Sequence, residues 1–348
     1  MRNILLFTLL YLSSGSLNAQ KLAGVVYDRA NRESVPGAHV YLEGSSLYDV
    51  TNADGRFEIT VNAIVNLPLV ISHISYQTTA ILNPFTALPD TIFVIEKETS
   101  LGEVVVEAGR YSRRQLFRAF RREFLGTSTA AQSCIIGNEE KIDIWFNRLT
   151  HTLSASCDEP VLIHNKYLGY KIYVTLEKFE VVYPGRQLGV GSPLLIDFEG
   201  STLFEDMASS NRTISNRRKN TFIGSPPHFL RALAVEKLED FDYYLLIKGD
   251  LFVKKPSDCF TVIDMDGGKK VLVNPLLIPA NFATYHGFTY HATVQVQRAR
   301  KEETEVIFFS DTFFIDAWGT LGKDMLFVGY MGSLRFGDKL PADYGIEF

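Results

Sequence analysis

The residues best suited to chemistry near the start of the chain lie in the stretch "NADGRFEIT", residues 52–60. Asn52 and Asp54 offer side-chain oxygens of the kind that bind Ca2+, but a calcium loop needs several such ligands around one point and a bidentate acid near its end. Glu58 follows too soon to be the closing acid of an EF-hand loop. We therefore predict that Asp54 and Gly55 form a turn, and that the alternating residues after it form a strand with one buried face.

Histidines are the next candidates, because a zinc site requires three or four converging ligands. His39 and Glu43 are four residues apart, which places them on one face of a strand without a third ligand in view. His286 and His291 are five apart, so on a strand they point to opposite faces unless Gly287 bends the chain. The spacing predicts surface or hydrogen-bonded histidines, and we expect neither a metal site nor a cofactor.

Patterns for nucleophilic catalysis are missing from the sequence. No stretch has the Gly-x-Ser-x-Gly pattern of a nucleophile elbow, and none has the glycines of a phosphate loop. Cys134, Cys157 and Cys259 follow neither a zinc nor a Cys-His pattern, and their number leaves both one disulfide and none open. Carboxylate pairs such as Asp264 and Asp266 are turn residues first, although a glycosidase pair is set by space rather than by sequence. We predict a protein without catalytic residues.

Two basic clusters could contact an anionic surface, an acidic glycan or a lipid phosphate. Residues 110–126, "RYSRRQLFRAFRREFLG", place apolar side chains on one face of a helix with arginines around the rest, and Ser112 with Gln115 makes a capping box. Residues 210–220, "SNRTISNRRKN", predict an exposed loop. For both clusters a solvated charged surface is the plainer interpretation. The candidate anion or partner contacts are Arg113, Arg114, Arg118, Arg217, Arg218 and Lys219.

The N-terminal segment, residues 1–19, has the pattern of a secretory signal peptide. Arg2 supplies positive charge, the apolar run after it has signal-peptide rather than membrane-spanning length, and Ala19 ends a cleavage site with a small residue. We expect the mature chain to begin at Gln20, where no cysteine stands to carry a lipid anchor. The protein is therefore expected to be exported.

Length and composition predict two domains rich in strands. The chain has 348 residues, more than the roughly 250 at which a single core stops growing. Its net charge of -5 gives no electrostatic reason to bind nucleic acid, and its aromatic content of 12% favours strands. From Lys21 onward, strand-like runs are broken by Pro36-Gly37 and Gly44-Ser45, a rhythm typical of a small antiparallel sandwich.

Alternation of apolar and polar residues marks individual strands. In residues 38–43 the even-numbered positions are apolar, so the odd-numbered ones, from His39 to Glu43, are expected to face water. Residues 170–179 and 290–297 alternate in the same way much later in the chain. The pattern predicts strands at both ends of the protein.

The N-terminal unit, residues 20–107, resembles the carboxypeptidase regulatory-like domain, a transthyretin-like sandwich of seven strands. The stretches that carry the resemblance are residues 24–26, 35–40 and 51–57, and "TSLGEVVVEAGR" resembles the end of such modules. The resemblance implies an exported protein of the Bacteroidetes type, in which this domain often precedes an outer-membrane receptor barrel. A carboxypeptidase catalytic domain is not expected, because none of the histidines is followed by Glu at the zinc-binding spacing.

The rest of the chain is predicted as an amphipathic basic helix or linker, residues 108–126, and a β-rich domain, residues 127–348. A hairpin is expected to turn at residues 266–268, and a second helix to begin with Ser225 as its cap and Pro226 in its first turn. Parts of this region resemble a downstream domain of unknown function found with the sandwich in exported Bacteroidetes proteins. These parts are residues 165–179, 222–233 and 336–344.

These features predict a non-catalytic binding or accessory protein of the cell envelope, periplasmic or associated with the outer membrane. The expected partners are an outer-membrane transporter or another envelope protein, or a glycan, recognised through loops and strand edges. One alternative is a carbohydrate-active or peptidase-like enzyme with its site in the C-terminal domain. Another is a small outer-membrane β-barrel, because Tyr344, Ile346 and Phe348 alternate at the chain end.

Overall fold

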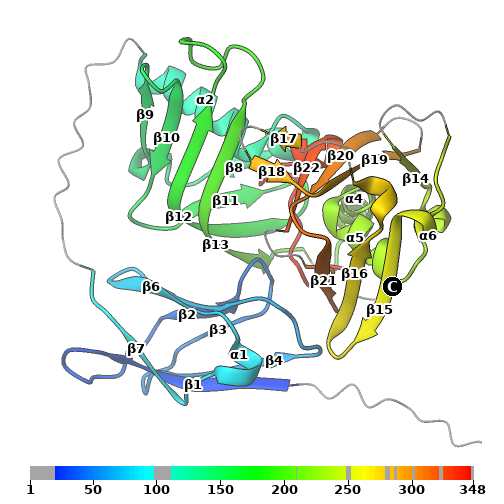
Figure 1. Cartoon of the computed structure of the whole chain (residues 1–348). Coiled ribbons are helices and arrows are strands. Elements are labelled where there is room, and N and C mark those ends of the chain that lie inside the picture. The colour runs from blue at the N-terminus through cyan, green and yellow to red at the C-terminus, as the bar shows by residue number, and fades with distance from the viewer. Residues whose placement is uncertain are drawn as a thin grey trace, which may run out of the picture.

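Figure 1 shows the computed structural model of the chain, in which three parts lie side by side. We call them the sandwich (residues 20–97), the sheet unit (111–208) and the C-terminal unit (210–345). The described chain is mainly β, as predicted. The predicted signal peptide and the stretch "TSLGEVVVEAGR" fall outside the described residues. The structure describes residues 20–97, 111–208, 210–247, 252–278, 283–285, 288–299, 302–320 and 324–345.

The sandwich has seven strands in two sheets, which confirms the predicted architecture. One sheet has the order β4-β1-β7 and the other the order β3-β2-β5-β6. Apolar side chains from both sheets, among them Val26, Val40 and Ile59, fill one buried core between them. The elements are β1 (Gln20–Asp28), β2 (His39–Leu42), β3 (Tyr48–Val50), β4 (Arg56–Val61), β5 (Leu69–His73), β6 (Tyr76–Ile81), β7 (Thr91–Val94) and the short helix α1 (Pro84–Ala87).

The turn in "NADGRFEIT" is held by the side chain of Asn52. Its Oδ1 accepts the backbone N–H groups of Asp54 and Arg56, both at 3.0 Å. Gly55 has a φ of +75°, and a Cβ there would lie 2.5 Å from the carbonyl oxygen of Val26. These contacts confirm the predicted turn, because only glycine suits that backbone and that space. The strand that follows buries alternate residues, Phe57, Ile59 and Val61.

A long hairpin organises the sheet unit. Strands β12 (Tyr170–Val182) and β13 (Leu195–Asp206) pair along their whole length. On its other edge β12 pairs with β11 (Val161–Asn165) in its first half and with β10 (Thr152–Ser156) in its second half. As predicted, Tyr170, Ile172, Val174 and Leu176 of β12 are buried, and a register shift follows Leu176. The outer strands are β8 (Cys134–Ile136) and β9 (Asp143–Asn147), and a 3-10 turn covers Glu139–Lys141.

Helix α2 (Arg113–Leu125) packs its apolar face on this sheet. The predicted capping box, which begins at Ser112, is present. Phe120 and Phe124 are fully buried, and their ring centroids lie 5.3 Å and 5.4 Å from that of Phe179. The basic residues therefore surround a helix whose other face belongs to the core of the sheet unit. A short helix, α3 (Thr129–Gln132), follows.

The C-terminal unit has its own core between helix α5 and two antiparallel sheets, ordered β14-β19-β20-β22 and β15-β16-β21. The predicted helix begins with Ser225 as its cap, and the predicted hairpin joins β15 to β16. The elements are α4 (Arg212–Phe222), α5 (Pro226–Ala234), β14 (Tyr243–Leu246), α6 (Pro256–Cys259), β15 (Phe260–Met265), β16 (Gly268–Val273), β17 (Ala283–Tyr285), β18 (Phe288–Tyr290), β19 (Ala292–Arg298), β20 (Glu302–Phe308), β21 (Thr312–Asp316), β22 (Met325–Gly329), α7 (Tyr330–Ser333) and 3-10 turns at Glu239–Phe241 and Pro275–Leu277.

Residues 210–220 were predicted to form an exposed basic loop. That prediction is wrong, because most of these residues belong to helix α4. Asn211 caps the helix by accepting the N–H groups of Thr213 and Ile214. Arg218 and Phe222 are buried on the side of the helix that faces the rest of the protein. The polar composition of this segment does not predict a helix, because α4 has no apolar stripe. The helix is stabilised by one cap and a few long-range contacts instead.

The segment after α7 returns from the C-terminal unit to the other two parts. The backbone N–H of Phe336 donates to the carbonyl of Phe124 in the sheet unit. The N–H of Ala342 donates to the carbonyl of Gly44 in the sandwich. This C-terminal segment, residues 334–345, thereby connects all three parts. Within the described ranges, no helix is long and apolar enough to cross a membrane.

Candidate functional site

One face of strand β2 meets the sheet unit instead of water. The sequence predicted that His39, Tyr41 and Glu43 would be solvated, and this prediction is wrong. Tyr41 is only 3% exposed, and its hydroxyl shares a 2.7 Å hydrogen bond with the hydroxyl of Ser201 on β13. Tyr41 also packs in an apolar cluster with Leu203 of the same strand. The long β12–β13 hairpin covers this face, which a local alternation pattern cannot reveal.

A cavity of about 350 Å³ lies where the three parts of the protein meet. We call it the junction cavity. The sandwich contributes Glu43, the sheet unit contributes Phe204 on β13, and the other walls come from the C-terminal unit. Lys339 of the C-terminal segment also lines the cavity. Its apolar lining includes Phe204, Phe222, Leu230, Phe327, Leu334 and Leu340.

Glu43 is the titratable group that the sandwich brings to this cavity. Both of its carboxylate oxygens lie 3.0 Å from the backbone nitrogen of Thr202, which donates to them. Burial raises the pKa of Glu43 to about 7, against the opposing effects of that hydrogen bond and of the positive charge on Lys339. Burial also raises the pKa of Asp338, another lining residue. The polar side of the cavity therefore changes charge close to neutral pH.

Trp318 closes another side of the junction cavity. It is completely buried and packs with the core of the sandwich, although it comes from the C-terminal unit. Its backbone N–H donates to Asp316 at 2.9 Å, and Asp316 also accepts the N–H of Asn66 in the sandwich at 2.8 Å. The indole N–H of Trp318 is buried without a hydrogen-bond partner among the described residues. An unpaired buried donor costs free energy, so this N–H is a weak point in the packing of Trp318.

Arg231 on α5 holds two walls of the cavity together. Its Nε donates to the carbonyl of Trp318 at 2.6 Å. Its two terminal nitrogens donate to the carbonyls of Ala342, Tyr344 and Gly345 at 2.6–2.8 Å. Burial lowers the pKa of Arg231 to about 10, so the guanidinium remains charged at neutral pH. One buried cation thus fixes the position of the C-terminal segment relative to Trp318.

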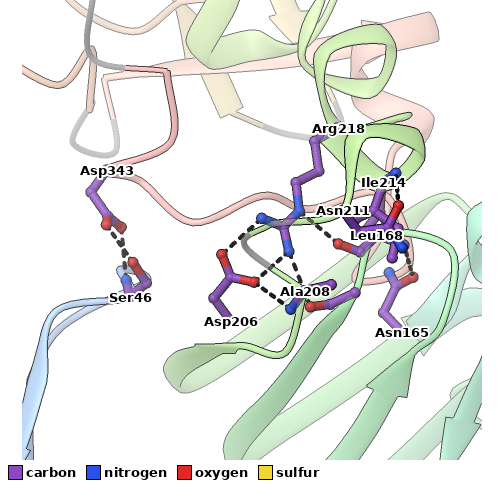
Figure 2. A network of polar contacts seen from close by, with 10 residues as sticks. Ser46, Asn165, Leu168, Asp206, Ala208, Asn211, Ile214, Arg218 and Asp343 are labelled. Atoms are coloured by element: carbon purple, nitrogen blue, oxygen red, sulfur yellow. Dashed lines mark hydrogen bonds and ion pairs between the residues drawn. The ribbon is translucent and has the colours of Figure 1, made fainter. Parts of the chain in front are cut away.

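Figure 2 shows that polar contacts also connect the parts next to the cavity. The backbone N–H and the hydroxyl of Ser46 both donate to Asp343, at 2.7 Å and 2.5 Å. Nearby, Arg218 makes a bidentate pair with Asp206 and donates to the carbonyl of Leu168 at 2.7 Å. The guanidinium of Arg218 is therefore fully engaged inside the protein.

The predicted basic contacts do not form one surface. Figure 1 shows α2 on the sheet unit and α4 beside α5, well apart. Arg113 donates to the carbonyls of Glu139 and Ile142, and the guanidinium of Arg217 lies 4.5 Å from the ring centroid of Tyr167. Arg114, Arg118 and Lys219 are exposed, so contact of these three with an anion stays a prediction.

The other residues weighed for chemistry have structural positions. Cys134, Cys157 and Cys259 are free thiols, two of them buried. His228 is buried and shares a 2.7 Å hydrogen bond with the hydroxyl of Tyr243. His286 falls outside the described residues, and no group of three or more metal ligands occurs among those that the structure does describe.

Sequence reasoning missed Trp318, Arg231 and the role of Glu43. Trp318 is one of only two tryptophans, and Arg231 interrupts the apolar stretch "HFLRALA". An arginine within an apolar helix is a usable signal, because a buried charge must have partners. The sequence does not show which residues these partners are, because they lie 87 to 114 positions further along the chain.

Comparison with known proteins bears on the sandwich alone. No curated protein matches the chain. The sequence model of the CarboxypepD_reg-like domain matches residues 22–106, which include the seven strands except the start of β1. The match agrees with the resemblance seen in the sequence and with the two-sheet structure. The N-terminal sandwich of this chain is a CarboxypepD_reg-like domain.

Proposed function

We propose that the chain is an exported, non-catalytic binding protein of the cell envelope, periplasmic or associated with the outer membrane, and that the junction cavity holds its ligand. The observation that carries the proposal is the convergence of all three parts of the protein on one largely apolar cavity. The signal-like residues 1–19 and the CarboxypepD_reg-like domain support the cellular location.

The lining indicates the kind of ligand. A volume of about 350 Å³ falls at the small end of the roughly 300–1,000 Å³ typical of ligand pockets. Rings and aliphatic side chains form most of the wall, whereas the carboxylate of Glu43, held by the backbone N–H of Thr202, is a polar group at a defined place. Such a wall favours a small apolar molecule, or an apolar side chain of a partner, that carries one hydrogen-bonding group.

The location of the cavity connects ligand binding with an accessory role. Its walls belong to the sandwich, the sheet unit and the C-terminal unit, so a bound ligand contacts all three. A ligand that binds only the assembled form stabilises that form. The protein would therefore present the sandwich to an envelope partner in a fixed orientation when the ligand is bound.

A fluorescence titration tests the cavity. The mature chain is titrated with N-phenylnaphthylamine, an apolar dye whose emission rises when it leaves water. Leu334 lines the cavity but belongs to none of the buried cores, so Leu334→Trp is expected to fill the space without unfolding the protein. We expect this change to weaken dye binding at least about tenfold, or 1.4 kcal/mol.

The matched control is Leu326→Trp, because Leu326 is 37% exposed on β22 and does not line the cavity. It should bind the dye as the unchanged protein does. Equal binding by the Leu334→Trp variant and the control would remove the junction cavity as the ligand site.

Export is tested separately from the cavity. Expressed in its own host, the protein should be recovered from the envelope fraction with Gln20 as its first residue. Pull-down from detergent-solubilised envelopes should then enrich a membrane transporter or another envelope protein. Recovery of an unprocessed chain from the cytosol would contradict the proposed location.

A further inference from the structure

A second opening lies between the sandwich and the sheet unit, on the same face of β2 as the junction cavity. It has a volume of about 310 Å³. We call it the aromatic groove. The residues on which the argument depends are His39, Tyr41 and His73 from the sandwich and Asn138, Glu159 and Tyr173 from the sheet unit.

The groove has a firm floor and fixed sides. On the floor, the hydrogen bond between Tyr41 and Ser201 joins the two parts of the protein. On the side of the sheet unit, Asn138 donates to Glu159 at 3.0 Å. Next to Glu159, the ammonium of Lys97 in the sandwich donates to the carbonyl of Asp158 at 2.9 Å. The groove therefore exists before any ligand binds, and little ordering is needed on binding.

Ring side chains give the groove its character. The imidazole of His39 lies between two tyrosines, with ring centroids 5.7 Å from Tyr173 in an edge contact and 6.3 Å from Tyr48 in a stacked one. His73 ends β5, the strand next to β2, and its ring lies 5.2 Å from that of Tyr76 at the start of β6. His39, His73 and Tyr173 are all only partly buried and line the groove, so part of each ring is accessible to a ligand there.

The two histidines add neutral hydrogen-bonding groups. Burial is the main cause that lowers the pKa of His39 and of His73, so both rings are uncharged at neutral pH. Nδ1 of His73 accepts the N–H of Ser75, which leaves the proton on Nε2 as a donor. A neutral imidazole supplies one donor and one acceptor.

Charge near the groove is balanced. Glu205 accepts the hydroxyl of Tyr173 at 3.0 Å and lies 3.8 Å from the ammonium of Lys171. That ammonium also lies 4.7 Å from the ring centroid of Tyr173. Glu159 has Asn138 as a donor and Lys97 nearby. Neither an anion nor a cation is therefore favoured strongly by the field of the groove.

We infer that the aromatic groove binds a neutral saccharide, with one sugar ring against Tyr173 and His39. Carbon-bound hydrogens on one face of a sugar pack on aromatic rings, and its hydroxyl groups both donate and accept, as the neutral imidazoles and carboxylates here require. The inference uses residues other than those of the junction cavity. It therefore adds a second ligand class and does not depend on the proposed apolar ligand.

Calorimetric titration of the mature chain with maltose, cellobiose and lactose tests the inference. We expect at least one of these disaccharides to bind with a Kd in the millimolar range or below. Tyr173→Ala should weaken that binding at least about tenfold, whereas Tyr173→Phe, which retains the ring, should remain within about threefold. His73→Ala, at the rim, should also weaken binding and serves if the Tyr173→Ala variant does not fold.

The Leu334→Trp variant is the matched control, since it alters the junction cavity and leaves the groove unchanged. It should bind the disaccharide normally. The inference would be overturned if none of the three sugars gave a heat of binding. It would also be overturned if the Tyr173→Ala and His73→Ala variants both bound the sugar with the affinity of the unchanged protein. Dye binding at the junction cavity is measured on the same samples, so failure of the groove is distinguishable from failure of the proposed function.

Discussion

The junction cavity and the aromatic groove lie at two ends of one face of strand β2. His39 and Tyr41 are alternate residues of β2, and Glu43 comes directly after the strand, with its carboxylate bonded to Thr202 of the sheet unit. At the cavity end, Glu43 meets a backbone N–H among apolar walls, whereas at the groove end His39 meets tyrosine rings. The difference shows that the covering hairpin, rather than β2 itself, decides the chemistry of each end.

The two ends also differ in how the parts of the protein are held together. Around the cavity, buried ionic groups such as Arg231 and Asp316 accept or donate several hydrogen bonds each. Around the groove, ring contacts and the hydroxyl bond of Tyr41 connect the parts. We therefore expect the largest losses of stability from changes at the cavity end.

Removal of Arg231 should have the largest effect. In the Arg231→Met variant, four carbonyl oxygens that now accept from the guanidinium lose their donor. The expected loss in the free energy of unfolding is about 3–5 kcal/mol, measured by urea denaturation, because buried acceptors would be left without partners.

Arg114→Met is the matched control for this change, since Arg114 is exposed at the start of α2. It should alter the free energy of unfolding by no more than about 0.5 kcal/mol. Equal losses in the two variants would mean that the contacts of Arg231 do not hold the cavity walls together.

The two ends should respond to pH in opposite directions. Burial raises the pKa of Glu43 from 4.5 to about 7, so between these values the folded state holds more protons than the unfolded state. The free energy of unfolding should therefore fall as pH rises through this window, by at most about 3 kcal/mol. Glu43→Gln keeps an acceptor for Thr202 and should remove this dependence.

His39 is expected to make the free energy of unfolding depend on pH in the opposite direction. Its pKa is lowered from 6.5 mainly by burial, so on acidification the unfolded state takes up the proton first. Its contribution to stability is complete above about pH 6.5 and is lost as the pH falls. Urea denaturation over pH 4–8 should show this acid loss reduced in the His39→Asn variant. Identical pH profiles for the Glu43→Gln and His39→Asn variants would refute the contrast between the two ends.

Local patterns in the sequence were sufficient to predict the turns, helix caps and strands in which those patterns occur. The turn at Asn52, the caps of α2 and α5 and the alternation in β12 were all confirmed, because each depends on residues within a few positions. The seven-strand sandwich followed from the same kind of pattern together with the resemblance of residues 22–106.

Long-range contacts account for what the sequence did not reveal. Helix α4 lacks an apolar stripe, and its Arg218 is buried because Asp206 and Leu168 lie opposite it. The face of β2 alternates as a solvated face does, yet β13 covers it some 160 residues later. Both openings exist only after distant segments meet, so neither could be predicted from spacing.

The smallest expected effect tests the floor between the two ends. Tyr41→Phe removes the hydroxyl that shares a 2.7 Å hydrogen bond with Ser201 but leaves the ring in its apolar cluster. The free energy of unfolding should fall by about 1 kcal/mol, because Ser201 is buried and loses its partner. Tyr48→Phe is the control, since the Tyr48 side chain is 39% exposed, and its change should stay below about 0.5 kcal/mol. A loss near 3 kcal/mol for Tyr41→Phe would contradict this expectation. It would mean that the contacts at the groove end stabilise the protein as much as those at the cavity end.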